Sequence, residues 1–175
     1  MRRLPFKLFA ALGIAAAAVL VPWKPRRYRL HRQQLIERPI DEVFAFFEDP
    51  RNLARITPPE MGFQIKSVEG LPVRAGTRIE YTIRIFGRPQ RWVAKIVEHE
   101  PGRRFVDVQA HGPYRYWRHE HSFEPLDVYT VMTDQVEYEL PFGLAGRIAN
   151  AVVARQLQRI FGYRTEAIDR VFRTD

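Results

Sequence analysis

Hydrophobic and polar residues alternate along much of the chain, and this two-residue period is typical of half-buried β-strands. The alternation is clearest at residues 77–86, where Ile79, Tyr81 and Ile83 share one face and charged residues occupy the other. The pattern predicts strands at residues 28–37, 63–69, 77–86, 90–99, 104–109, 114–124 and 130–140. Because most of the connections are short turns with glycine or proline, consecutive strands are expected to pair antiparallel.

Helical spacing replaces this alternation in three places. Apolar residues at i, i+3, i+4 and i+7 predict a helix after the first strand. These residues are Ile40, Val43, Phe44 and Phe47. Asp49 and Pro50 are typical of an N-cap and a first helical residue, and they predict a second short helix that ends at Pro58 and Pro59.

The third helical segment is long and amphipathic, at residues 144–172. Its apolar stripe includes Val153, Leu157, Ile160, Ile168 and Val171. Arginines are expected on the opposite, polar face. The order of elements is therefore one strand, two short helices, six strands and one long helix. This order predicts an α+β fold in which a seven-stranded antiparallel sheet wraps around the C-terminal helix and leaves a hollow between them.

Three stretches of the sequence are similar to one group of proteins. They are PIDEVFAFFEDPRNLARITPPEMGF, RWVAKIVEHEPGRRFVDVQAHGPYRYWRHEHSFEP and MTDQVEYELPFG. Together with the order of elements, they resemble the START-like (SRPBCC) superfamily, and within it the cyclase/dehydrase-like ligand-binding group. The resemblance covers residues 28–172 and implies a helix-grip fold with an internal cavity for a hydrophobic molecule, such as a lipid or an isoprenoid-like compound. That group contains enzymes as well as lipid carriers, and the resemblance implies no metal and no cofactor.

The first 27 residues follow neither pattern, and a typical member of that group lacks them. Residues 8–23 carry no charge and as a helix would span about 24 Å, less than the hydrocarbon core of about 30 Å. Basic residues flank both ends, and Trp23 lies where an interfacial aromatic residue is expected. The pattern favours a single-pass membrane anchor with a basic linker at residues 1–27, followed by a ligand-binding domain at residues 28–175.

Two alternatives to the anchor remain open. One is a signal peptide, cleaved near Ala16, Ala17 and Ala18, which would give an exported protein. The other is a buried or interfacial helix. The charges on the two flanks are nearly equal, and they favour a cytoplasmic domain by a small margin.

Charge also separates the N-terminal segment from the rest. Seven of the 28 basic residues lie within residues 1–29, which contain no acidic residue, whereas the remainder has 21 basic and 20 acidic residues. The seven are Arg2, Arg3, Lys7, Lys24, Arg26, Arg27 and Arg29. A nearly neutral domain is not expected to bind nucleic acid. The chain has no cysteine, which excludes disulfides, thiol catalysis and cysteine-ligated metal centres.

The polar residues with catalytic potential concentrate in YWRHEHSF. On a strand, His119 and His121 share a face with Trp117 and Phe123, which marks that face as the inner one. Asp134 lies on the more apolar face of the next predicted strand. Since paired strands share a face, Asp134 is expected opposite His119 or His121, or one step away.

Three roles remain open for His119, His121 and Asp134, which are the candidate catalytic residues. They can orient the polar end of a ligand, act as a general acid/base pair, or hold a metal ion with open positions. Ligand orientation is favoured, and no metal is expected. The predicted ligand-binding residues are Tyr81, Ile83, Trp92, Trp117, His119, His121, Phe123, Asp134 and Tyr138.

The leading functional hypothesis is a carrier or sensor of a hydrophobic small molecule, tethered at a membrane through residues 8–23. The first alternative is a cyclase, aromatase or dehydratase that acts on an apolar substrate with the His–Asp pair. The second is a protein-interaction module. Neither the ligand nor a protein partner is specified by the sequence.

Overall fold

The computed structural model describes residues 26–141 and 143–173, so the predicted anchor at residues 8–23 lies outside the described residues. The elements in chain order are β1 Tyr28–Ile36, α1 Ile40–Glu48, the 3₁₀ helices η1 Pro50–Ala54 and η2 Pro59–Met61, β2 Gln64–Glu69, β3 Arg78–Ile85, β4 Arg88–Glu100, β5 Arg104–His111, β6 Tyr116–Leu126, β7 Tyr129–Glu139 and α2 Gly143–Arg173. Among these elements, no helix is both long enough and apolar enough to cross a membrane.

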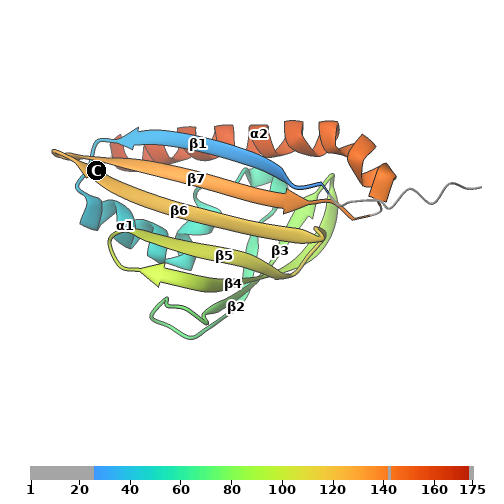
Figure 1. Cartoon of the computed structure of the whole chain (residues 1–175). Coiled ribbons are helices and arrows are strands. Elements are labelled where there is room, and N and C mark those ends of the chain that lie inside the picture. Colours follow the sequence, from blue (N-terminus) through green and yellow to red (C-terminus); the bar gives the residue numbers. More distant parts are fainter. Residues whose placement is uncertain (1–25, 142, 174–175) are drawn as a thin grey trace, which may run out of the picture.

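The seven strands form one antiparallel sheet in the order β1-β7-β6-β5-β4-β3-β2, with α2 lying along it beside β1 (Figure 1). Side-chain hydrogen bonds join β1 to this helix. Gln34 Nε2 donates to the Thr165 carbonyl oxygen at 3.0 Å and to Asp169 Oδ1 at 2.6 Å. The predicted α+β helix-grip fold is confirmed.

The 3₁₀ helix η1 begins as Asp49 and Pro50 predict, and a second 3₁₀ helix, η2, was not predicted. Asp49 Oδ1 accepts the Arg51 backbone N–H at 2.9 Å and Pro50 is the first residue of η1, as predicted. Pro58 and Pro59 were expected only to end that helix. Pro59 instead begins a further 3₁₀ turn, η2, because proline is well accepted at a first helical position.

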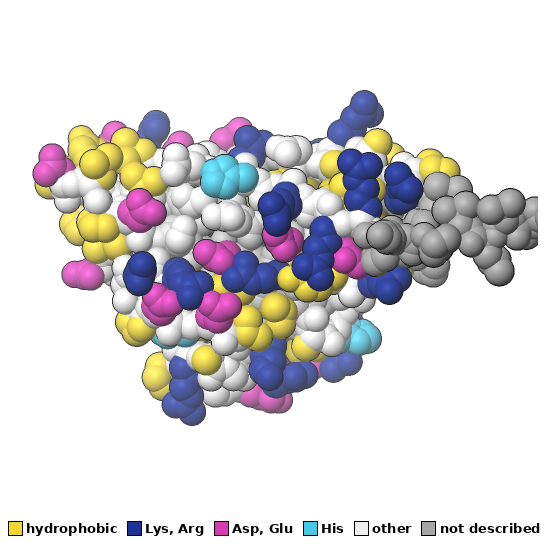
Figure 2. Space-filling view, in the orientation of Figure 1, with side chains coloured by type: hydrophobic (Ala, Val, Ile, Leu, Met, Phe, Trp, Pro, Cys, Tyr) yellow, Lys and Arg dark blue, Asp and Glu magenta, His cyan; other side chains and the backbone are white. Residues whose placement is uncertain are grey.

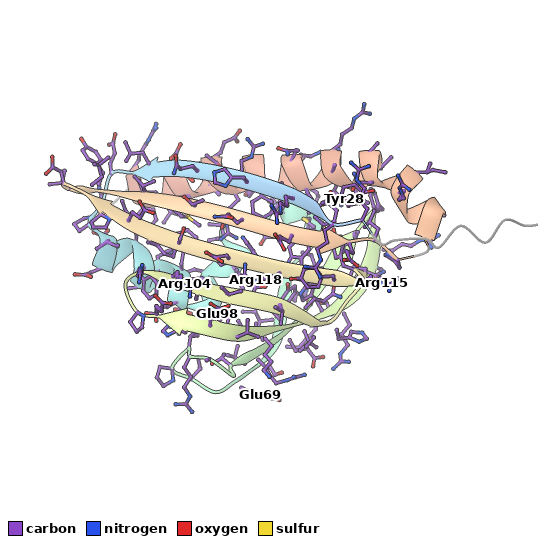
Figure 3. The ribbon with its side chains drawn as sticks, viewed as in Figure 1. Tyr28, Glu69, Glu98, Arg104, Arg115 and Arg118 are labelled. Atoms are coloured by element: carbon purple, nitrogen blue, oxygen red, sulfur yellow. The ribbon has the colours of Figure 1, made fainter. Side chains whose placement is uncertain are left out.

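The outer face of the sheet carries paired charges. Arg104 Nη1 lies 2.7 Å from Glu98 Oε2, and Arg118 Nη2 lies 2.8 Å from Glu120 Oε2. Figure 3 shows Glu98, Arg104 and Arg118 close together on this face, and Figure 2 shows basic and acidic side chains interspersed across it. Since side chains alternate along each strand, the opposite face of the sheet is left for the interior.

The interior contains two hydrophobic clusters. The larger one joins α1, the sheet and the C-terminal half of α2, and includes Phe44, Phe123 and Ile168. The smaller one joins β1, β7 and the middle of α2, and includes Leu30 and Leu157. The stripe predicted for the C-terminal helix is therefore the face that packs against the sheet.

Candidate functional site

A cavity of about 180 Å³ lies between the inner face of the sheet and α2. For scale, a dry cavity of roughly 150 Å³ in another protein is large enough to bind benzene. The alternation predicted for β3 is confirmed, since Ile79, Tyr81, Ile83 and Ile85 all line the cavity. Most of the remaining lining is also apolar or aromatic, and it comes from β4 to β6, from α2, and from α1 and the residues that follow it as far as Val73.

Strand β4 curls over this cavity through two irregularities. Its pairing with β5 shifts register between Val93 and Ala94, and again between Ile96 and Glu98. Bulges of this kind bend a strand and increase its twist. Trp92, Ala94 and Ile96 have the two-residue spacing of one strand face, and all three line the cavity where the strand bends.

A polar cluster forms one wall of the cavity where β5, β6 and β7 lie side by side. His121 is directly opposite Asp134 on β7, so the predicted proximity of the two is confirmed. Asp134 Oδ1 lies 3.0 Å from His119 Nε2 and 2.9 Å from His121 Nδ1. Asp107 of β5 is opposite His119, and its Oδ2 lies 3.7 Å from His119 Nδ1 and 3.4 Å from His121 Nε2. Each imidazole therefore lies between two carboxylates.

Arg164 of α2 completes the cluster. Its Nε lies 3.3 Å from Asp134 Oδ2, and the residue is only 9% exposed. The prediction that arginines occupy only the polar face of this helix is wrong at Arg164. It lies on the apolar stripe between Leu157 and Ile168, because the buried carboxylate of Asp134 requires a cation.

Burial and neighbouring charges have opposing effects on the pKa values of Asp134, His119 and His121. Burial alone would raise the pKa of Asp134, but Arg164 and the hydrogen bonds from the two imidazoles hold that pKa well below its ordinary value. Burial and the neighbouring His121 lower the pKa of His119, although Asp134 opposes them. Burial alone would also lower the pKa of His121, but the contacts of this imidazole with Asp107 and Asp134 outweigh the effect of burial and raise the pKa.

These pKa directions favour a neutral His119 that donates its Nε2–H to Asp134. The raised pKa of His121 increases the protonated fraction of this imidazole, which lies between the two carboxylates and has its Nδ1 3.3 Å from Arg164 Nη2. Arg164 and the two imidazoles together compensate the buried carboxylate of Asp134, which lowers the cost of burying it beside an apolar cavity.

Two buried N–H groups at the cavity wall have no hydrogen-bond acceptor among the described residues, Trp92 Nε1 and Arg164 Nε. The contact of Arg164 Nε with Asp134 is an ion pair without hydrogen-bond geometry. An unsatisfied buried donor costs about 1–3 kcal/mol. Both atoms have almost no exposed surface, so a hydrogen-bond-accepting atom of a ligand reaches either group only after neighbouring side chains move.

The predicted ligand-binding residues divide into two groups. The cavity is lined by Tyr81, Ile83, Trp92, Trp117, His119 and His121. The other three predicted residues, Phe123, Asp134 and Tyr138, are not part of the lining. Phe123 is 1% exposed and packs in the larger hydrophobic cluster, and Asp134 lies behind the imidazoles. Tyr138 packs in the smaller cluster, where its hydroxyl donates to Asn150 Oδ1 at 2.9 Å.

The sequence analysis missed two members of the polar cluster. Asp107 follows the inward-facing Phe105 by two residues, so strand alternation already placed it on the inner face. Arg164 is seven residues after Leu157, a spacing that returns it to the apolar stripe. A charged residue on an otherwise apolar face was the available signal in both cases.

This fold and its cavity define a START-like protein of the hydrophobic-ligand-binding type. A sequence model of the family described as polyketide cyclase / dehydrase and lipid transport matches residues 36–161. The chain belongs to this family. The comparison with curated protein sequences found no match.

Solved structures share the fold at low sequence identity. The Zhui aromatase/cyclase from Streptomyces sp. R1128 is 17% identical with a TM-score of 0.66, over 82% of this chain and 92% of that chain. A norcoclaurine synthase from Thalictrum flavum is 12% identical with a TM-score of 0.65, over 85% and 96%. A START superfamily protein from Mycobacterium smegmatis is 11% identical with a TM-score of 0.62, over 82% and 98%. At these identities the likeness concerns the fold alone.

Proposed function

We propose that the protein is a carrier or sensor that binds an apolar small molecule with a hydrogen-bond-accepting oxygen. The observation that carries this proposal is a largely apolar cavity whose lining residues Trp92 and Arg164 each hold a buried N–H without a hydrogen-bond acceptor among the described residues. Ligand sites usually combine such a lining with a few polar groups that fix orientation. A lipid or isoprenoid-like compound with a hydroxyl or carbonyl group has the required chemistry.

A second hollow provides an entry route. It has a volume of about 320 Å³ and shares Met61, Gln156 and Ile160 with the lining of the cavity. Phe86 and Val152 lie on its rim and are 58% and 57% exposed. A ligand longer than the cavity could extend through this hollow toward the surface.

We also propose that residues 8–23 anchor the protein in a membrane with this rim near the bilayer. β1 begins at Tyr28, at the end of the sheet where the β3–β4 turn and the start of α2 also lie (Figure 1). The hollow is lined in addition by Arg84, Arg155 and Arg159, which suit anionic headgroups. Tethering would bring the entry route close to apolar molecules dissolved in the bilayer.

Intrinsic fluorescence offers a direct test of cavity binding. The chain has three tryptophans, and the two besides Trp23 both line the cavity. In full-length protein with Trp23→Phe, we expect farnesol, an isoprenoid alcohol, to change the emission at saturable concentrations. Farnesene, the hydrocarbon of the same skeleton, should bind about tenfold more weakly, because it offers no acceptor to the unsatisfied donors.

Two substitutions on β4 locate the binding site. Ala94→Phe fills the cavity and should remove the farnesol response. Val97→Phe is the matched control, because Val97 is 38% exposed on the same strand. Binding that survives Ala94→Phe, or equal affinities for the alcohol and the hydrocarbon, would count against the proposal.

The imidazole pair at the cavity wall favours a second candidate function, a cyclase, aromatase or dehydratase. His119 and His121 both line the cavity and Asp134 orients both rings, which is the arrangement required for proton transfer to and from a bound substrate. Native mass spectrometry of the small molecule that co-purifies with the protein tests this function. Loss of water, or formation of an isomer of the same mass with a different chromatographic retention time, would establish turnover if it is absent in His119→Gln. Recovery of the unchanged compound from both proteins would favour the carrier.

A further inference from the structure

We infer that Asp107, His119 and His121 form a binding site for a divalent transition-metal ion whose open coordination positions face the cavity. This inference goes beyond the proposed function, which requires no metal. It also departs from the sequence-based expectation that the protein binds none. Three donor atoms and the carboxylate behind them define the site.

The three donor groups converge on one point. Asp107 Oδ2 lies 3.4 Å from His121 Nε2 and 3.7 Å from His119 Nδ1. One donor atom from each of the three residues lies within 4.8 Å of the other two. A tetrahedral ion with bonds of about 2.1 Å places its ligand atoms about 3.4 Å apart. Small side-chain rotations would bring all three into contact with one ion.

Asp134 holds both imidazoles in the orientation that a metal requires. His119 Nε2 and His121 Nδ1 both face Asp134 Oδ1, at 3.0 and 2.9 Å. The other nitrogen of each ring, Nδ1 of His119 and Nε2 of His121, is therefore turned toward Asp107. Metal-binding histidines commonly donate their second N–H to a carboxylate in this way, which fixes the tautomer and strengthens the ligand. Arg164 in turn holds Asp134 in place.

The donor set specifies the class of ion, and the location of the site makes the ion accessible from the cavity. Two imidazoles and one carboxylate suit Zn²⁺, Fe²⁺ and Co²⁺, whereas Ca²⁺ and Mg²⁺ prefer oxygen ligands alone. Three protein ligands leave at least one coordination position open. Because Asp107, His119 and His121 all line the cavity, an oxygen-bearing molecule in the cavity could reach that position.

Metal titration of the full-length protein, without any organic ligand, tests this inference. Chelator-treated protein is titrated with Co²⁺ and followed by visible absorption and calorimetry. We expect one equivalent of Co²⁺ with the intense absorption of a low-symmetry site, displaced by one equivalent of Zn²⁺. Asp107→Asn should lower the affinity at least 100-fold, and Asp134→Asn by about 10- to 100-fold as the loss of an outer partner.

The matched control removes imidazoles elsewhere. His31 and His111 are exposed, so the double variant His31→Gln/His111→Gln should bind Co²⁺ as the wild type does. The Asp107 side chain is 16% exposed, and asparagine has nearly the same size, so this variant should remain folded, which circular dichroism checks. The inference is overturned if wild type takes up no stoichiometric Co²⁺, if Asp107→Asn binds it equally well, or if uptake depends on the two surface histidines. Farnesol binding is measured separately, so either proposal can fail alone.

Discussion

Asp134 is in contact with three side chains, His119, His121 and Arg164, and all four residues are at most 9% exposed. A buried carboxylate is tolerated only when its charge is compensated, and here an arginine and two imidazoles share that task. The same contacts fix the ring orientations at the cavity wall. At the residue scale, the stability of the interior and the geometry of the site therefore depend on one side chain.

Replacing that carboxylate should be strongly destabilising. Asp134→Asn leaves Arg164 buried without its anion, and we expect a loss of about 3–5 kcal/mol in the free energy of unfolding at neutral pH. Urea denaturation measures this difference. The control is Glu80→Gln, because the Glu80–Arg91 pair on the outer face is in contact with solvent and should change the free energy of unfolding far less.

The pH dependence of that loss has a definite sign. Because the pKa of Asp134 is depressed in the folded state, its charge stabilises the fold above the unfolded pKa of about 3.9, and this contribution is lost as the pH falls through the folded pKa. The difference between wild type and Asp134→Asn should therefore shrink below about pH 4. A constant difference down to acid unfolding would contradict the charged state assigned to Asp134.

Trp92 tests the proposed role of the unsatisfied donors. Trp92→Phe removes an N–H that has no acceptor among the described residues, so it should cost little beyond the lost ring area. Affinity for farnesol should fall by roughly three- to tenfold, as expected for one lost hydrogen bond, while affinity for farnesene stays nearly constant. Equal losses for the two compounds would show that the indole contributes only apolar contact.

At the scale of elements, α2 has two functions. Its middle and C-terminal part pack against the sheet through Leu157 and Ile168, whereas residues 152–160 border the second hollow with other side chains of the helix. Ile148 is 73% exposed and Val152 is 57% exposed. An exposed apolar rim beside arginines is expected where a protein meets a membrane surface or a departing ligand.

Val152 allows the entry route to be tested. Val152→Glu places a negative charge at the rim, where it would repel anionic headgroups. We expect slower transfer of farnesol from anionic vesicles to the protein, with its equilibrium affinity unchanged. Stopped-flow fluorescence of the cavity tryptophans measures the rate. Val128→Glu is the control, because Val128 is 66% exposed in the β6–β7 turn at the opposite end of the sheet; equal rates in both variants would exclude this route.

At the scale of the whole molecule, the ligand-binding domain is predicted to fold without the N-terminal segment. The sheet order is complete from β1 to β7, and α2 packs on it through described residues alone. A chain that starts at Tyr28 should therefore be soluble and unfold cooperatively in urea. Recovery only as aggregates would show that residues 1–27 are required for folding.

The tether prediction concerns the full-length chain. Residues 8–23 are expected to keep it with membranes in high salt and carbonate, because salt screens the basic linker but does not extract an inserted helix. Fractionation followed by N-terminal sequencing measures both outcomes. Release by salt alone would indicate surface adsorption. A mature N-terminus near Val19 would indicate cleavage and export.

The sequence by itself determined all the elements except η2, and it placed Asp134 opposite His119 or His121 or one step away. Strand alternation and helical spacing are local properties, and β6 and β7 are joined by so short a turn that their register follows from neighbouring residues. Only the tertiary structure decided that Asp107 and Arg164 join them. Asp107 meets His119 through the register of β5 against β6, whereas Arg164 reaches Asp134 because of where α2 lies across the sheet, and that position is an outcome of packing among residues distant in sequence.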